Sequence, residues 1–144
     1  MPDQTMSVSR LAEPGVYVPP FDALRRSAEV SSVRGELRVA LSYDAFVAVV
    51  RTLVAAIPVD EAFYLRTYAD VAQAIRDGSV TSARQHYVDD GYLEGRLPSD
   101  PAFDEAYYLD AHPDVAEQVR TGRLPSARFH YVMDGYREGR RPHA

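Results

Sequence analysis

The sequence predicts an all-α fold in which a capping helix precedes two tandem three-helix repeats, with a partly extended N-terminal arm in front. The first observation behind this prediction is that residues 60–98 align without a gap on residues 104–142, with 23 of the 39 positions identical. The second is that residues typical of helix starts and helix ends recur at the same places in both copies. Such internal repetition indicates stacked helical units packed side by side.

These observations divide the chain into four segments. Residues 1–40 form the N-terminal arm, 41–58 the capping helix, 59–100 the first repeat and 101–144 the second repeat. In the arm, "EPGVYVPPF" is typical of extended or polyproline II chain, because two prolines and a glycine exclude a regular helix. We expect a helix in "FDALRRSAEVSSV", a short strand in "GELRVALS", and no fixed structure in the first residues alone.

The capping helix is predicted in "SYDAFVAVVRTLVAAIP". Ser42 is a favoured N-cap residue, and Pro58 cannot continue a helix. Between them, apolar side chains recur at helical spacing and form a broad face. We expect this face to pack on the first repeat and cover its open end, as terminal caps do in repeat arrays.

Each repeat contains the signals for three short helices. In the first copy, Asp60 is an N-cap, the second helix begins at Ala69, and Gly78 is placed to end it in a left-handed conformation. Ser82 caps the third helix, and we expect Gly91 to end it in the same way as Gly78. The second copy has the equivalent residues 44 positions later, with proline at the start of its second helix.

Charge and composition exclude several classes of partner. The net charge is −5, and all sixteen basic residues are arginine. Residues 1–58 contain six arginines and six acids, and residues 59–144 contain ten against fifteen. Because neither half is basic, we expect neither nucleic acid nor an anionic membrane as a partner. Without a signal-peptide core or an apolar run of membrane-spanning length, we expect a cytoplasmic protein.

Histidine and aspartate recur on the third helix of each repeat. His86 and Asp90 stand four residues apart on one helical face, as do His130 and Asp134. Such a pair can bind a metal or relay a proton. It can equally be structural, with an inward histidine hydrogen-bonded to a carboxylate. We favour the structural interpretation, because structural residues recur with every repeat.

Side chains beyond the third helix are the candidates for recognition. Each "YxEGR" segment places a tyrosine, a glutamate and an arginine after the glycine, and the arm adds two aromatic residues. We expect most such Glu–Arg pairs to close a turn, with the arginine reaching helix carbonyls or an acid of the next unit. The candidate contact residues are Tyr92, Glu94, Arg96, Tyr136, Glu138, Arg140, Tyr17 and Phe21.

Catalytic signatures are missing from the sequence. It has no cysteine, no GxSxG segment and no glycine-rich phosphate loop, so it predicts no catalytic residue, no cofactor and no resident metal. The tyrosines at 64, 87, 108 and 131 fall on predicted inward faces, and we expect them in the core.

The segment "DEAYYLDAHPDVAEQVRTGRLPSARFHYVMDGYREGR" resembles a short repeat that is often appended to bacterial surface-polysaccharide glycosyltransferases, related methyltransferases and some large secreted calcium-binding proteins. The resemblance covers residues 60–142, and the first copy departs from the pattern in having Ala69 where proline is usual. It implies an accessory helical module, because catalysis in those chains lies in other domains. It carries over no catalytic residue.

The residues and the resemblance together predict a non-enzymatic interaction module or accessory subunit. Its partner would be another protein, such as an enzyme of the same pathway, with a link to bacterial polysaccharide assembly implied only by the resemblance. One alternative is a carbohydrate-binding module that uses Tyr92, Tyr136 and nearby arginines. A second alternative is a small metal-dependent enzyme built on the two His–Asp pairs. Because two repeats are few, either the capping helix closes the array or the chain forms a homodimer.

Overall fold

The computed structural model describes residues 19–144, and 52% of these described residues are helical. The chain divides into two compact units, one ending at Leu53 and the other comprising Val54–Ala144. Tyr17 and the start of the predicted arm lie outside the described residues. Among residues 19–144, none of the helices is both long and apolar enough to cross a bilayer.

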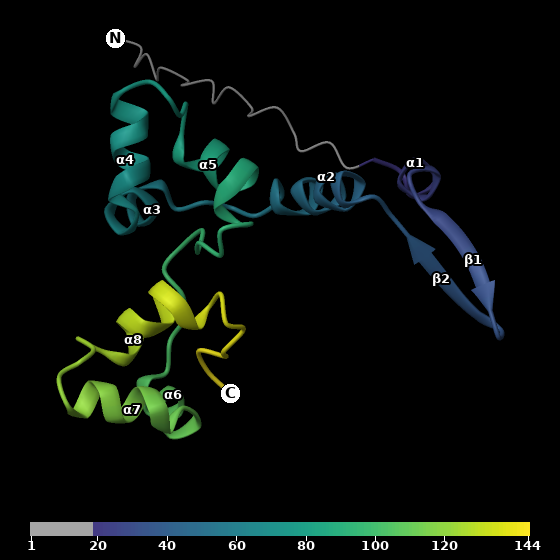
Figure 1. The fold of residues 1–144 in the computed structure, drawn as a ribbon. Coiled ribbons are helices and arrows are strands. Elements are labelled where there is room, and N and C mark those ends of the chain that lie inside the picture. The colour runs from purple at the N-terminus through teal and green to yellow at the C-terminus, as the bar shows by residue number, and fades with distance from the viewer. Residues whose placement is uncertain (1–18) are drawn as a thin grey trace, which may run out of the picture. The chain divides into compact units, whose positions relative to one another are not determined.

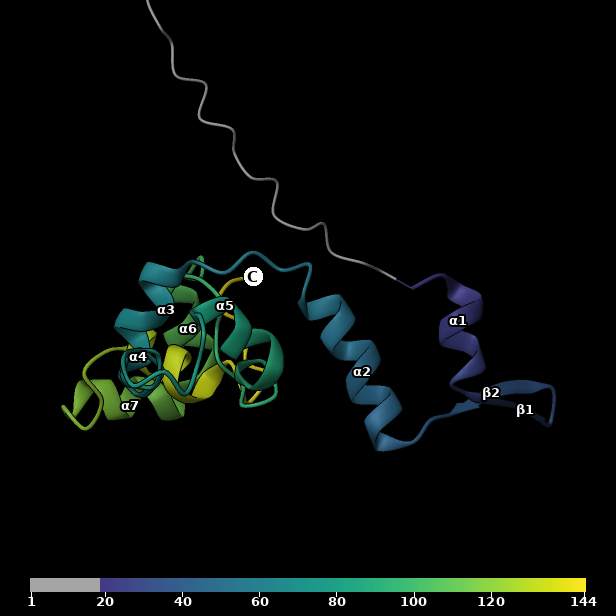
Figure 2. The same ribbon diagram turned by 90° about the horizontal axis from the view of Figure 1, so that it is seen from above.

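The described part of the first unit is a helix, a hairpin and a second helix (Figures 1 and 2). Its elements are α1 (Phe21–Arg26), β1 (Glu29–Val33), β2 (Glu36–Ala40) and α2 (Tyr43–Val54). The antiparallel strands pair Val30 with Val39 and Ser31 with Arg38. Arg34 and Gly35 form the turn with φ of 53° and 79°, the left-handed pair that two-residue hairpins require.

The hairpin corrects two expectations. The fold is mostly helical rather than all-α, and the helix expected over "FDALRRSAEVSSV" ends at Arg26. The remainder of that segment forms β1, because "EVSSV" is rich in valine and serine, which are weaker helix formers, and it lies beside a strand with alternating apolar residues. The expected strand in "GELRVALS" is confirmed as β2.

Helix α2 begins where the sequence predicts and ends earlier. Ser42 Oγ accepts a hydrogen bond from the Ala45 amide at 3.2 Å, which is the expected N-cap. The helix ends at Val54 rather than at Pro58, and the Arg84 guanidinium donates to the carbonyls of Ala55 and Ile57 just beyond its end. That this helix covers the first repeat stays a prediction.

Each repeat folds as three helices, the third of which continues into a π-helical turn (Figure 1). The first repeat contains α3 (Glu61–Thr67), α4 (Ala69–Arg76), α5 (Ala83–His86) and the turn η1 (Tyr87–Gly91). The second contains α6 (Glu105–Ala111), α7 (Pro113–Arg120), α8 (Ala127–His130) and the turn η2 (Tyr131–Gly135). All four predicted side-chain N-caps are confirmed, since their oxygens accept amide hydrogen bonds of 2.9–3.0 Å; they are Asp60, Ser82, Asp104 and Ser126.

Each repeat is also closed on itself. The Asp60 amide donates to the Pro98 carbonyl, and the Asp104 amide donates to the Pro142 carbonyl, both at 2.9 Å. The two ends of each aligned segment, 60–98 and 104–142, are therefore joined by a backbone hydrogen bond. This closure holds the "EGR" tail next to the helices of its own repeat.

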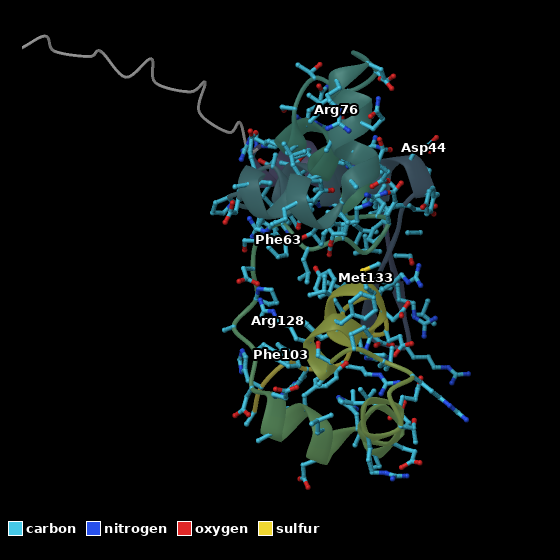
Figure 3. All side chains as sticks on the ribbon, turned by 90° about the vertical axis from the view of Figure 1, so that its left-hand side faces the viewer. Asp44, Phe63, Arg76, Phe103, Arg128 and Met133 are labelled. Atoms are coloured by element: carbon cyan, nitrogen blue, oxygen red, sulfur yellow. The ribbon has the colours of Figure 1, made fainter. Side chains whose placement is uncertain are left out.

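The two repeats share a hydrophobic core. Phe63 and Leu97 of the first repeat are buried in one cluster with second-repeat side chains, and Figure 3 shows Phe63 on the side of its repeat that faces the second. The second-repeat members of this cluster are Tyr108, Val115, Ala127 and Tyr131. The residues equivalent to Phe63 and Leu97 are Tyr107, which is half-buried, and Arg141, which is exposed. More polar residues at these positions suit the end of an array.

Candidate functional site

The recurring histidines are hydrogen-bonded to core tyrosines. His86 Nδ1 lies 3.0 Å from the Tyr64 hydroxyl, and His130 Nδ1 lies 3.0 Å from the Tyr108 hydroxyl. In each repeat this contact joins the first helix to the third. The four predicted core tyrosines are confirmed as buried, so each of these histidines binds a side chain of the core itself; the tyrosines are Tyr64, Tyr87, Tyr108 and Tyr131.

The expected His–Asp hydrogen bond is replaced by this His–Tyr bond. The side chain of Asp90 is exposed, and Asp134 lies 3.5 Å from the guanidinium of Arg137. Among residues 19–144, no group of three or more His, Cys, Asp or Glu side chains is placed to hold a metal ion. The structure therefore does not gather the two His–Asp pairs into one metal site.

Gly91 and Gly135 are needed for close approach rather than for a left-handed helix end. Neither has a positive φ, and a Cβ on either would collide with the hydroxyl of Tyr64 or Tyr108. The helix instead passes through the glycine as a π-helical turn, a feature that often marks special packing. The left-handed glycine comes later, at Gly95 in the first repeat.

Burial keeps the core tyrosines protonated. It raises the pKa of Tyr108 to about 12, and it raises the pKa of Tyr64 further. A hydroxyl with so high a pKa donates or accepts a hydrogen bond near neutral pH without losing its proton. These tyrosines are therefore suited to positioning the histidines and poorly suited to act as bases.

Each "EGR" arginine holds two carboxylates. Arg96 donates to both oxygens of Asp70, at 2.9 and 2.7 Å, and to Glu94 at 2.6 Å. Arg140 makes the same three contacts with Asp114 and Glu138, at 3.0, 2.9 and 2.6 Å. Asp70 and Asp114 each belong to the same repeat as the arginine that they bind, and each lies in the first turn of the second helix of that repeat. This corrects the expectation that the arginines reach helix carbonyls or an acid of the next unit.

The charges in each group stabilise one another. The hydrogen bonds from Arg96 lower the pKa of Asp70, and those from Arg140 lower the pKa of Asp114. The same contacts raise the pKa of both arginines. Arg96 is largely buried while Asp70 is exposed, so each arginine acts as a clamp between the tail and the second helix.

Tyr68 of the first repeat is replaced by His112 in the second. Tyr68 lies 4.8 Å edge-to-face from Tyr64, and its hydroxyl accepts a hydrogen bond from the Leu97 amide at 2.8 Å. The equivalent His112 keeps the aromatic contact with Tyr108 at 4.5 Å, but its Nε2 is buried without a hydrogen-bond partner. Burial, followed by the nearby Arg140 charge, lowers the pKa of His112.

The predicted contact tyrosines lie together at the junction of the repeats. Tyr92 and Leu93 of the first repeat and Tyr136 and Arg137 of the second line one shallow depression of about 340 Å³. Each tyrosine packs edge-to-face, at 6.3 Å, on a core tyrosine of its own repeat. Tyr92 is exposed and Tyr136 is half-buried, so both rings combine a fixed position with access from solvent.

An apolar groove in the first unit is a feature that was not predicted from the sequence. It has a volume of about 420 Å³ and is lined by α1, both strands and α2. Of the residues proposed from sequence, it includes only Phe21, which is 76% exposed. The alternation of Leu37, Val39 and Leu41 was the available signal, since period two is typical of a half-buried strand.

Comparison with protein-family models, curated proteins and solved structures found no match to this chain. The resemblance noted from the sequence therefore stays a prediction.

Proposed function

We propose that this chain is a non-enzymatic helical-repeat module that binds another protein at the junction of its two repeats. The observation that carries the proposal is that the recurring histidines and arginines are hydrogen-bonded within their own repeat. The histidines bind core tyrosines and the arginines bind acids of their own repeat. The residues that resembled a duplicated catalytic site thus have structural roles in both copies.

Apolar side chains also remain exposed on the third helix of the second repeat. Phe129 and Met133 stand four residues apart on the third helix of the second repeat and are 45% and 49% exposed. Their first-repeat equivalents are the polar residues Gln85 and Asp89, so this apolar pair is specific to one copy. Figure 3 shows Met133 on the side of its helix toward the first repeat.

We define the junction surface as Tyr92, Leu93, Phe129, Met133, Tyr136 and Arg137. Gly95 connects its parts, since it lines both the tyrosine depression and a groove of about 440 Å³ that contains Met133. Tyrosine, phenylalanine, methionine and arginine are the residue types enriched in protein–protein interfaces. The surface therefore favours a protein partner, and the resemblance suggests an enzyme of polysaccharide assembly.

Site-specific photo-crosslinking in the bacterial host tests this proposal. A photoreactive phenylalanine analogue at Phe129 should give one discrete adduct, whereas the same analogue at the matched position Gln85 should give none. Met133→Asp, which introduces the residue of the first repeat, should remove most of the adduct. Equal yields from the two positions, or no adduct from Phe129, would contradict the proposal.

One observation favours carbohydrate as a second candidate ligand. Tyr92, Tyr136 and Arg137 line the same depression, and aromatic rings beside a cationic donor suit a sugar ring and its hydroxyls. A glycan array tests this alternative. Binding that is lost in Tyr92→Ala and kept in Tyr43→Ala, an exposed tyrosine of the first unit, would support it. An array without signal for the unaltered chain would rule it out.

A further inference from the structure

The described residues leave the apolar groove of the first unit uncovered. Among the described residues that line the groove, Arg25 is the one charged residue, and the others are apolar. Its volume of about 420 Å³ is many times the ~30 Å³ share of one water, so side chains of a partner can enter it.

The hairpin contributes one face to this groove. Val30 is paired with Val39, and Leu37 lies two residues before Val39, so the three side chains share a face. Ser31 and Arg38 are paired on the opposite face. The hairpin is therefore amphipathic, with an apolar face on the groove and a polar face away from it.

This apolar face is open to solvent in a single copy. Leu37 is 74% exposed and Val39 is 63% exposed. Within the described residues the sheet has two strands, and an isolated two-stranded hairpin is marginally stable in water. Packing of the apolar face against another element would supply the missing burial.

The exposed area matches one side of a stable dimer. Phe21, Val30, Leu37, Val39 and Leu41 are 36–76% exposed and together offer on the order of 400 Å² of apolar surface. A standard interface buries ~800 Å² per partner, of which roughly 450 Å² is non-polar. One copy of the face thus supplies about the apolar area that each half of such an interface needs.

Charge favours self-association through this unit. Residues 19–53 contain five arginines and four acidic residues, a net charge of +1, whereas residues 54–144 contain ten arginines and fifteen acids, a net charge of −5. Two copies of the repeats repel each other, but two copies of the hairpin unit meet with little repulsion. The near-neutral unit also offers little attraction to a strongly charged partner.

We propose that a second copy of this chain covers the groove, with the apolar hairpin faces of the two copies packed together about a two-fold axis. An isologous contact of this kind uses the same patch on both chains, which fits a single self-complementary apolar face. The proposed contact uses residues of the first unit alone, so it does not depend on the proposed function.

Light scattering coupled to size exclusion on the full chain tests the dimer. From micromolar to millimolar concentration, the chain should show about twice its 16.1 kDa monomer mass. Leu37→Glu places a charge on the apolar face and should raise the dissociation constant roughly 100-fold or more. Val39→Thr nearly keeps the shape of the side chain, so it should raise the dissociation constant by less than Leu37→Glu does. The far-ultraviolet circular dichroism of Val39→Thr should match that of the unaltered chain.

Two matched controls define the result that would overturn the proposal. Ser31→Glu places the same charge on the opposite face of the same hairpin, and Leu93→Glu places it on an exposed apolar residue of the repeats. Both variants should remain dimers. A chain that is monomeric at every concentration, as it would be if another protein covers the groove, contradicts the proposal. Equal weakening by Ser31→Glu and Leu37→Glu contradicts it as well.

Discussion

The recurring histidines His86 and His130 each depend on a glycine five residues further along the chain. The Tyr64 hydroxyl reaches His86 because Gly91 has no side chain, and the same holds for Tyr108, His130 and Gly135 in the second repeat. Since the two copies agree in detail, the three residues form one structural unit that joins the first helix to the third.

Replacement of Gly135 by alanine tests this unit. We expect Gly135→Ala to lower the free energy of unfolding by about 2 kcal/mol, because the new Cβ collides with the Tyr108 hydroxyl. Urea denaturation followed by circular dichroism measures the effect. In Tyr108→Phe the hydroxyl is gone, so adding Gly135→Ala should cost less than it does alone. Fully additive losses would show that the glycine acts through something other than the hydroxyl.

His112 lacks the hydrogen bond that the equivalent Tyr68 makes in the first repeat. We expect His112→Tyr to raise the free energy of unfolding by about 1 kcal/mol at pH 7. The new hydroxyl can accept a hydrogen bond from the Arg141 amide, just as the Tyr68 hydroxyl accepts one from the Leu97 amide. Thermal unfolding measures this gain, and Tyr68→His should show a comparable loss.

The stabilisation by His112→Tyr should be larger at acidic pH. Because the pKa of His112 is lowered in the folded chain, the unfolded chain binds its proton first, and stability falls as pH drops below the ordinary histidine pKa of ~6.5. The advantage of His112→Tyr should therefore be larger at pH 5 than at pH 8. A gain that does not change with pH would show that His112 contributes no titration to stability.

At the scale of elements, the tail of each repeat is held by its arginine. Arg96 bridges Glu94, in the tail, and Asp70, in the first turn of α4, where the helix dipole also favours a negative charge. Together with the backbone bond from Asp60 to Pro98, this clamp fixes the irregular tail against regular helices.

Asp70→Asn removes one charge from the clamp. Because Asp70 is exposed, we expect a loss of about 1 kcal/mol at pH 7 and no more. The folded pKa of Asp70 is lowered, so its contribution is present above the ordinary aspartate pKa and is lost as pH falls through the folded value. The difference between the variants in urea denaturation should therefore shrink below about pH 3. A loss that persists there would have another cause than ionisation.

At the scale of the whole molecule, the two repeats share a core, and we expect them to unfold together. Phe63 is buried among second-repeat side chains, whereas its equivalent Tyr107 is half-buried at the other end of the array. The same helix position thus joins two units in one copy and ends the array in the other.

Matched alanine variants test this asymmetry. Phe63→Ala should cost about 3 kcal/mol, because it opens a cavity in the shared core, whereas Tyr107→Ala should cost less than about 1 kcal/mol. Amide hydrogen exchange should show faster exchange in both repeats of Phe63→Ala. Exchange that increases only in the first repeat would mean that the repeats unfold separately.

Local signals predicted most of the repeat fold. The caps at Asp60 and Ser82 and the helix start at Ala69 are contacts between neighbours in the chain, so residue type and spacing were enough to place them. Gly91 was misassigned, because a left-handed helix end and a close approach both select glycine. The hairpin was missed in part, because its strand β1 depends on pairing with β2.

Residue type and spacing alone specify the repeat, its length and the starts of its helices, since these rest on contacts within a few residues. Tertiary structure decided what the recurring polar residues do. His86 binds Tyr64, 22 residues away, and Arg96 binds Asp70, 26 residues away, and spacing along the chain specifies neither partner. The tertiary structure also determines that the junction surface and the hairpin groove stay exposed, because the burial of a residue depends on every element that packs around it.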